Sequence, residues 1–197
     1  MPDREMTEAF LSCLDRDARE FSFRTFSDSP YTRQAGFDPL ERAIHSSLTG
    51  CWGELAELNC AGAAIAVTIN QTNGRSRTVE AIRRVRALFL DDDLGITPEC
   101  FELPPHMRVI TSKGHSHYYW LVSDLALSDF SRYQACLAAR FAGDHRVVAL
   151  NQAMQLPGFW RRKQVTRPRM PDFDHLHEGP PYQSIQLQQL LGAVATA

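Results

Sequence analysis

The sequence has few cysteines, and none of them lies close to another. Five occur in 197 residues, as Cys13, Cys51, Cys60, Cys100 and Cys136. An odd number of widely separated cysteines argues against a disulfide framework and against a zinc knuckle, both of which need paired or closely spaced thiols. We therefore expect the protein to work in a reducing cytoplasm.

Long apolar runs, repeats and low-complexity segments are also missing. No run reaches the roughly 18–20 apolar residues that a membrane-spanning helix needs, and the polar start Met-Pro-Asp-Arg-Glu-Met does not match a secretory signal. We expect no membrane partner. Apolar residues make up 44% and charged residues 22% of the chain, as in ordinary globular domains. The length suits one domain, or two small interleaved halves.

The formal net charge is only -2, so the chain as a whole is not basic. Ten of its 21 basic residues nevertheless fall in two short windows. These hold Arg75, Arg77, Arg83, Arg84 and Arg86, and then Arg161, Arg162, Lys163, Arg167 and Arg169. Local basic stripes on a neutral chain are typical of a groove that follows phosphates. Two solvated surface segments explain the charge pattern equally well.

Helical and strand patterns mix along the chain without a strict βαβ rhythm. Helical spacing is expected over about 6–18, around 52–58 with an end near Gly62, over 130–141 with an end at Gly143, and after 187. Strands are expected at 21–26, 63–69, 85–90, 108–111, 117–122 and 182–187, and a loop at 30–39. We predict an α+β fold with a mainly antiparallel sheet.

Three aspartates, Asp91, Asp92 and Asp93, follow the apolar strand Ala87–Leu90. Side chains alternate along a strand, so Asp91 and Asp93 share one face and Asp92 points the other way. Two carboxylates on one face make an oxygen-rich site of the kind that Mg²⁺ or Mn²⁺ prefers. An acidic strand end in solvent is the alternative, and the buried strand in front favours the metal site.

A hairpin is expected around the turn 112–116. One face of its second strand carries His117 and Tyr119, and His117 or the amides of the turn could donate to a triphosphate. His115 and His117 also form a His-x-His pair that could ligate a metal directly. Further along, Asp144 follows a helix end and fits a helix N-cap. The turn Leu156–Gly158 precedes aromatic and basic residues that suit contact with bases and phosphates, although a plain surface loop fits as well.

The order and spacing of these motifs resemble the RepB-like plasmid primases of the archaeo-eukaryotic primase superfamily, the primase–polymerases. The motifs read Asn-x-x-x-Gly-Arg…Arg-Val-Arg-Ala-Leu-Phe-Leu-Asp-x-Asp, then Thr-Ser-x-Gly-x-x-His-x-Tyr-Trp-Leu-Val, then Gly-Asp…Leu-Pro-Gly-Phe-x-x-x-Lys. The similarity spans about Phe23 to Lys163. Any one motif is weak, whereas the three together are fairly specific.

The resemblance implies a catalytic core in which an RNA-recognition-motif-like sheet packs against a second α/β layer. We expect one catalytic domain over 1–197, with an N-terminal layer at about 1–84 and a catalytic layer at about 85–197. By the same resemblance Asp91, Asp93 and Asp144 are metal ligands, and Ser112, His117 and Lys163 bind the nucleotide. Arg75, Arg77, Arg161 and Arg162 are the candidate nucleic-acid contacts.

The implied function is a metal-dependent nucleotidyltransferase that makes short primers on single-stranded DNA in bacterial plasmid or phage-like replication. Its expected partners are Mg²⁺ or Mn²⁺, nucleoside triphosphates, the template strand, and other domains or replication proteins such as a helicase or an initiator. The chain departs from the pattern at Asp92, where relatives carry an apolar residue, which suggests an edge strand. Ala149, Gln152 and Gln155 replace an acid and two arginines, which puts nucleotide or template contact there in question.

Two other functions compete with priming. An HUH-type nicking nuclease or relaxase would use His115 and His117 as metal ligands and a tyrosine nucleophile, for which Tyr133 is the candidate. Against it, Ser116 between the histidines is not bulky and apolar. A non-catalytic module that binds single-stranded nucleic acid would keep the fold and lose the chemistry.

Overall fold

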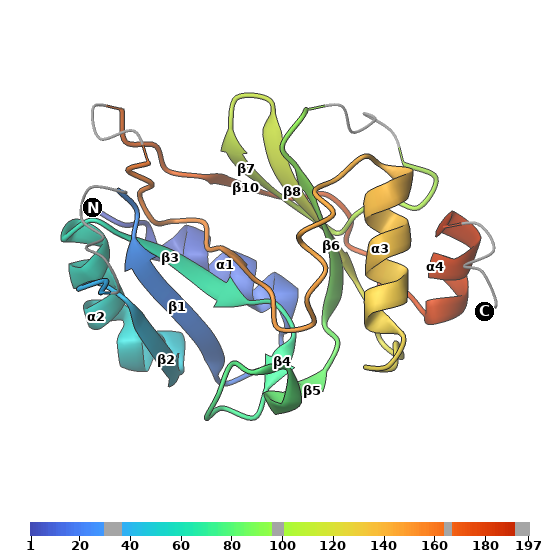
Figure 1. The fold of residues 1–197 in the computed structure, drawn as a ribbon, viewed down its shortest axis with the longest axis horizontal. Helices are drawn as coiled ribbons and strands as arrows, with labels where there is room; N and C mark the ends of the chain where they lie inside the picture. Colours follow the sequence, from blue (N-terminus) through green and yellow to red (C-terminus); the bar gives the residue numbers. More distant parts are fainter. Residues whose placement is uncertain (30–36, 96–100, 164–166, 192–197) are drawn as a thin grey trace.

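The computed structural model describes residues 1–29, 37–95, 101–163 and 167–191. The fold is α+β, as predicted, and every ladder that joins named strands is antiparallel. Two four-stranded sheets lie next to each other, and helices pack against them (Figure 1). In the segment 69–86 the chain forms a small two-stranded ladder of β4 (Gln71–Thr72) and β5 (Ile82–Arg84), with a 3-10 turn η2 (Val79–Ala81) before β5.

The first sheet has the order β2-β1-β3-β9. Its strands are β1 (Phe21–Ser27), β2 (Arg42–Ser46), β3 (Ala63–Thr68) and β9 (Ala153–Gln155), and helix α2 (Leu48–Cys60) packs against β3 and β1. Side chains along each strand alternate between the two faces of this sheet. Phe23, Ile65 and Val67 enter the core, whereas Arg24 and Ala66 face the other way and line a cleft. Strand β9 comes from the C-terminal part of the chain and completes this sheet.

The second sheet has the order β10-β7-β8-β6. Its strands are β6 (Ala87–Asp92), β7 (Met107–Ser112), β8 (His115–Leu121) and β10 (Asp172–His175). Helix α3 (Phe130–Arg140) packs against β6, and helix α4 (Ser184–Leu191) lies beside α3. The β7–β8 hairpin turns at Lys113 and Gly114, a shorter turn than the predicted one. Gly114 adopts a φ of 77°, which favours glycine.

Helix α1 (Arg4–Leu14) connects the two sheets from behind (Figure 1). Its N-cap Asp3 accepts a hydrogen bond from the Met6 amide at 3.0 Å. The ring of Phe10 packs against Tyr119 of β8 and Phe173 of β10, with centroids 5.6 and 5.5 Å away. At the other side, Thr7 donates to the carbonyl of Pro157. The helix therefore fixes the Pro-Gly turn after β9 relative to the second sheet.

Several sequence expectations needed correction. The strand predicted at 182–187 is wrong, because Ser184 begins helix α4 and Tyr182 forms only an isolated bridge with Val122. Strands β2, β9 and β10 were not predicted. They have only three to five residues and lack an apolar alternation strong enough to stand out. The expected loop at 30–39 lies largely outside the described residues. None of the described helices is long and apolar enough to cross a membrane.

Residue His106 is a buried structural group that joins the second sheet to the C-terminal segment. Only 1% of it is exposed. Its Nδ1 accepts a hydrogen bond from the Leu121 amide at 3.1 Å, and its Nε2 lies 3.2 Å from the carbonyl of Pro180. Burial lowers the pKa of His106 from its usual 6.5 to about 4. The imidazole is therefore neutral in the folded protein at neutral pH.

We predict that the fold loses stability as the pH falls from about 6.5 towards 4. The unfolded chain takes up a proton on His106 near pH 6.5, whereas the folded chain does so only near pH 4. The loss is at most roughly 3 kcal/mol. Urea unfolding at about pH 7.5 and about pH 4.5 measures it. His106→Asn should be less stable at both pH values but should lose less on acidification. The exposed control His145→Asn should behave like the wild type, and an unchanged acid loss in His106→Asn would contradict the assignment.

Candidate metal and nucleotide site

Strand β6 lies at the edge of its sheet, as the unusual Asp92 suggested. Its outward-facing backbone groups form hydrogen bonds with a side chain of α3 and with the segment that follows α3. The carboxamide of Gln134 on α3 takes the place of a neighbouring strand. It accepts from the Phe89 amide at 3.2 Å and donates to the Phe89 carbonyl. Two residues further, the amide of Asp144 donates to the carbonyl of Asp91 at 3.0 Å. These bonds satisfy backbone groups that an open edge would leave unpaired. They also fix Asp144 beside Asp91.

The approach of the 142–144 segment to β6 depends on Gly143. A Cβ atom at this position would overlap the buried side chain of Leu90 and would lie 3.3 Å from the carbonyl oxygen of Asp91. The left-handed residue that ends α3 is Ala142, with a φ of 52°, and not the glycine that we expected to end the helix. Gly143 is therefore required for close packing.

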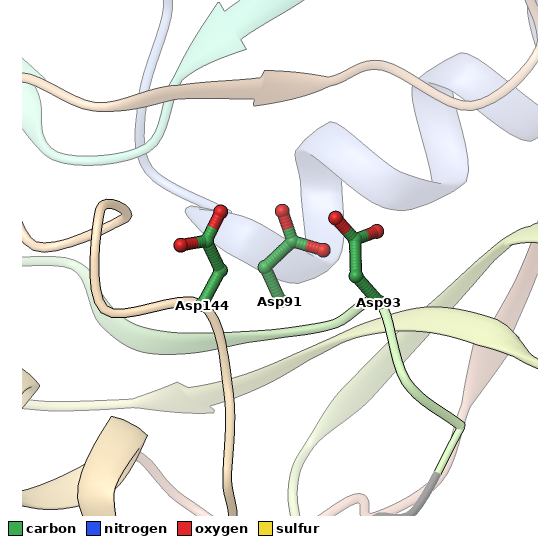
Figure 2. A group of neighbouring side chains, drawn as sticks. All are labelled: Asp91, Asp93 and Asp144. Atoms are coloured by element: carbon green, nitrogen blue, oxygen red, sulfur yellow. The ribbon is translucent and has the colours of Figure 1, made fainter.

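Three carboxylates converge at the end of β6, and Figure 2 shows them in a row. Oxygen atoms of Asp91, Asp93 and Asp144 lie within 4.8 Å of one another. In the described part of the chain this is the one group of three or more histidine, cysteine or acidic residues that could hold a metal ion. The side chains of Asp91 and Asp144 are mostly buried, with 17% and 16% exposed, whereas Asp93 is 60% exposed. Asp92 lies on the opposite face and is buried.

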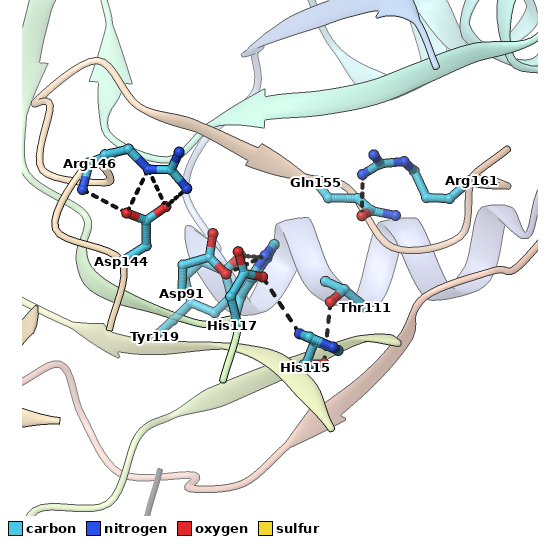
Figure 3. A network of polar contacts seen from close by, with 10 residues as sticks. Asp91, Thr111, His115, His117, Tyr119, Asp144, Arg146, Gln155 and Arg161 are labelled. Atoms are coloured by element: carbon cyan, nitrogen blue, oxygen red, sulfur yellow. Dashed lines mark hydrogen bonds and ion pairs between the residues drawn. The ribbon is translucent and has the colours of Figure 1, made fainter. Parts of the chain in front are cut away.

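Residue His117 lies directly across the β6–β8 ladder from Asp91. Its Nε2 is 3.4 Å from a carboxylate oxygen of Asp91, and its Nδ1 is 3.5 Å from the hydroxyl of Tyr119. Burial, and to a smaller extent the charge of Asp91, raises the pKa of Tyr119 well above its usual value, so this hydroxyl keeps its proton. Two residues earlier, His115 is more exposed, and its Nδ1 lies 3.7 Å from Asp93. Figure 3 shows these side chains together.

The carboxylate of Asp144 is held by Arg146. The guanidinium Nε lies 3.0 Å from Oδ1 and the terminal nitrogen 2.8 Å from Oδ2, and the Arg146 amide also donates to Oδ1 at 2.9 Å (Figure 3). These hydrogen bonds lower the pKa of Asp144. The described segment between Asp144 and β9 contains no helix, so the predicted N-cap role is wrong: the contact with the Arg146 amide closes a turn, in which the Val147 amide donates to the Asp144 carbonyl at 3.0 Å. Arg146 itself is 86% exposed.

The acidic group opens into a cleft of about 1100 Å³ between the two sheets. Asp91, Asp93, Ser112 and His117 line one side, together with the hairpin. The first sheet forms the other side with small residues such as Ala64, Ala66 and Ala153. Five cations also line the cleft, namely Arg24, Arg161, Lys163, Arg167 and Arg169. Carboxylates at one place and cations around them fit a ligand that carries both a metal ion and phosphates.

Comparison with known proteins identifies the family. A family model of the RepB DNA-primase N-terminal domain matches residues 44–174. The chain belongs to this primase family. Among curated proteins, no relative matches. Because the matched segment contains β6, the hairpin, Asp144 and β9, the acidic group and most of the cleft lie within the primase-family region.

Solved structures of primases share the fold. The primase–polymerase domain of cyanophage S-2L superposes with a TM-score of 0.74 at 20% identity, over 96% of this chain and 98% of that one. The primase RepB' superposes at 0.66 and 16% identity, over 94% of this chain but only 61% of that one. The catalytic domain of RepB' in complex with initiator DNA gives 0.63 at 17% identity, over 98% and 94%. At these identities the likeness concerns the fold.

The structure separates the basic residues of this primase-family chain into those that face the cleft and those that serve the fold. Arg86 is buried and pairs with Asp15 at 2.6 Å, and Arg84 pairs with the same carboxylate. Arg162 donates to the carbonyl of Asn59 near the end of α2. Arg75 is exposed outside the residues that line the cleft, and Arg77 donates to Thr68 on the first sheet.

Of the four candidate nucleic-acid contacts, only Arg161 lines the cleft, and its guanidinium pairs with the buried Asp28. Lys163 and Ser112, the candidate nucleotide contacts, also line the cleft. Sequence reasoning missed Arg24, although a charged residue inside the apolar strand Phe21–Phe26 was a usable signal. The geometry does not favour a nicking nuclease, because Tyr133 is 2% exposed and its hydroxyl is engaged by Gln188.

We predict that Gly143→Ala separates Asp144 from Asp91. The added methyl has no room against Leu90 and the Asp91 carbonyl, so the segment must shift, and overpacking of this kind costs about 1–3 kcal/mol. Manganese affinity measured by calorimetry should fall together with the melting temperature. Gly53→Ala is the matched control, because nothing lies near its Cβ and it is inside a helix. That variant should be neutral or slightly more stable. Unchanged metal affinity in Gly143→Ala would show that the close approach is not needed.

Proposed function

We propose that this chain is a metal-dependent nucleotidyltransferase that makes short primers on single-stranded DNA during plasmid or phage-like replication. The observation that carries the proposal is the convergence of three carboxylates, from two separate segments, at one end of a cleft lined with cations. Membership of the primase family supplies the reaction class. We propose further that the chain acts as one catalytic domain in a bacterial cytoplasm, alongside other replication proteins.

The donor set fits Mg²⁺ or Mn²⁺. Asp91, Asp93 and Asp144 offer only carboxylate oxygens, which these hard cations prefer, and they offer them from a fixed strand end. Bound there, divalent metal would lower the pKa of the attacking hydroxyl and neutralise charge on the leaving group. The exposed side of Asp93 leaves the group open towards the cleft, where a nucleotide's phosphates can reach it.

The residues around the acidic group then have separate tasks. Lys163 brings positive charge to the triphosphate, and His117 and Ser112 offer hydrogen-bond donors to it from the β7–β8 hairpin. Arg167 and Arg169 extend this charge along the cleft, where a template strand carries its phosphates. The Tyr119 hydroxyl contacts Nδ1 of His117, so the opposite ring nitrogen, Nε2, is the one directed to the acidic group, 3.4 Å from Asp91.

The proposed reaction joins a primer to one nucleotide. The 3′-hydroxyl oxygen forms a bond to the α-phosphorus, the bond to the bridging oxygen breaks, pyrophosphate leaves, and the hydroxyl proton passes to solvent. The protein's contribution is to position the reactants and to supply fixed charges where charge develops. Incubation with single-stranded circular DNA, labelled nucleotides and Mn²⁺ or Mg²⁺ tests the proposal. Binding of DNA that is insensitive to EDTA, without nucleotide incorporation, would instead indicate a non-catalytic binding module.

We predict that Asp91→Asn, Asp93→Asn and Asp144→Asn each abolish incorporation while leaving the protein folded. Each change removes one charged ligand and keeps the shape of the side chain. Metal titration by calorimetry and thermal melting should be measured on the same samples. Asp129→Asn, an exposed acid on α3's N-terminal side, is the control and should remain active. The Asp92→Asn variant should bind metal as tightly as the wild type. Because Asp92 is buried, the substitution should act on the stability of the fold instead. Activity in Asp144→Asn at reduced stability would leave that residue with a structural role only.

We predict an asymmetry between the two histidines. His117→Ala should raise the nucleotide KM, because His117 is buried against Asp91 and faces the cleft, whereas the exposed His115→Ala should cost little. Loss of one hydrogen bond to a charged group corresponds to a rise of about 10- to 150-fold. Steady-state nucleotide titration measures it, with metal affinity from calorimetry. Equal, metal-linked losses in both variants would mean that the pair ligates the metal, as a nicking nuclease requires.

A further inference from the structure

The side chain of Gln155 is buried in the wall of the cleft, and the NH₂ group of its amide makes no hydrogen bond within the described part of the chain. The residue is 8% exposed and ends strand β9. Its Nε2 atom is the one buried side-chain nitrogen or oxygen without a hydrogen-bond partner, among the residues that the structure describes. A buried amide that is left without a partner costs free energy, so such a group in a binding cleft calls for a ligand.

The orientation of this amide is fixed by a chain of polar contacts. Arg161 donates to Oε1 of Gln155 at 2.5 Å (Figure 3). The Nε atom of the same guanidinium lies 3.0 Å from Oδ1 of Asp28. Asp28 is buried, so the pair is anchored inside the protein. A guanidinium has only donors and must face the amide oxygen, not the amide nitrogen. The NH₂ group is thereby kept as the free end.

The two arginines placed nearest to Gln155 by the sheet register and by contact are both paired with carboxylates. Arg24, which is in register with Ala66, pairs with Glu41 at 3.1 Å. The positive charge of Arg161 is matched by Asp28. Gln155 pairs with Ala66 across the β3–β9 ladder, and both residues line the cleft with Ala64 and Ala153. A wall of small apolar side chains can accept a flat ring or a sugar, and a neutral amide donor suits an uncharged acceptor better than a phosphate. The groups that suit phosphates, the imidazole of His117 and the ammonium of Lys163, are other residues of the same cleft.

We propose that Nε2 of Gln155 donates a hydrogen bond to an uncharged acceptor on the sugar or base of the incoming nucleotide, with Arg161 as the residue that positions the amide. This inference rests on the proposed function and deepens it. It assigns the wall formed by β3 and β9 to the nucleoside, and the wall formed by the β7–β8 hairpin to the triphosphate. Gln155 would then determine how tightly the nucleoside part is held.

Equilibrium binding tests the proposal without any turnover. The full chain with Mn²⁺ is titrated with nucleoside triphosphates and, separately, with inorganic triphosphate. Gln155→Met keeps the size of the side chain and removes the donor. It should weaken nucleoside triphosphate binding about 2- to 13-fold, the effect of one neutral hydrogen bond, and should leave inorganic triphosphate binding unchanged. Gln155→Glu removes the donor but keeps the acceptor for Arg161, and it should also weaken nucleoside triphosphate binding. Gln189→Met, at an exposed position of α4, is the control.

The ligand series then locates the acceptor. An effect that is confined to ribonucleotides assigns it to the 2′-hydroxyl, an effect that changes with the base assigns it to the base edge, and a uniform effect assigns it to the rest of the sugar. Each of these supports the proposal. Equal weakening of inorganic triphosphate by Gln155→Met would overturn it, since the amide would then act on phosphate. No weakening at all would overturn it as well, because water would then satisfy the amide. A wild type that binds no nucleotide would overturn the proposed function together with this inference.

Discussion

The free edge of β6 is the constraint on which the site depends. An edge strand leaves every second amide and carbonyl unpaired, and these groups need partners when the strand is buried. Here the Gln134 side chain serves Phe89, and the backbone of Asp144 serves Asp91. The same hydrogen bond that completes the strand brings the third carboxylate to the first. A requirement of the fold and a requirement of the chemistry are thus met by one contact.

The cleft has a related origin in the alternation of the first sheet. Its inner face fills the core with Phe23, Ile65 and Val67, whereas its outer face carries alanines that leave space. Helix α1 fixes the distance between the sheets from behind, because Phe10 packs on the second sheet while Thr7 bonds to the Pro157 carbonyl. A rigid support of this kind keeps the two walls of a binding site at a constant separation.

The sequence predicted the parts of the site that follow from local patterns. Alternation along one strand put Asp91 and Asp93 on one face with Asp92 opposite, and the hairpin put His117 and Tyr119 on one face of its second strand. The pairing of that strand with β6, which places His117 across from Asp91, was not predicted. Asp144 looked like a cap from the residues alone, and only the family resemblance made it a candidate ligand. Its position depends on a contact between residues 53 apart. Local patterns contain no such information.

Counting basic residues in the sequence predicted poorly which arginines line the cleft, and the reason is physical. Arg86 and Arg162 look like their neighbours in the sequence, but Asp15 and the end of α2 take them as internal partners. Whether an arginine faces solvent, a ligand or a buried carboxylate depends on the fold around it. Gln155 was noted as a departure from the family pattern, and its unused donor became visible only because Arg161 and Asp28 orient the amide.

The acidic group also shows how the protein itself can hold like charges close together. Three carboxylates within 4.8 Å repel one another, and the nearby side chains offset this repulsion unequally. His117 is buried against Asp91, whereas Arg146 holds Asp144 from a position that is 86% exposed. An exposed guanidinium is well hydrated when it leaves its partner, so its ion pair is weak compared with a buried one. A divalent cation bound as proposed would therefore replace Arg146 on Asp144 without disturbing the core, while the hydrogen bond from the Asp144 amide would keep the carboxylate in place.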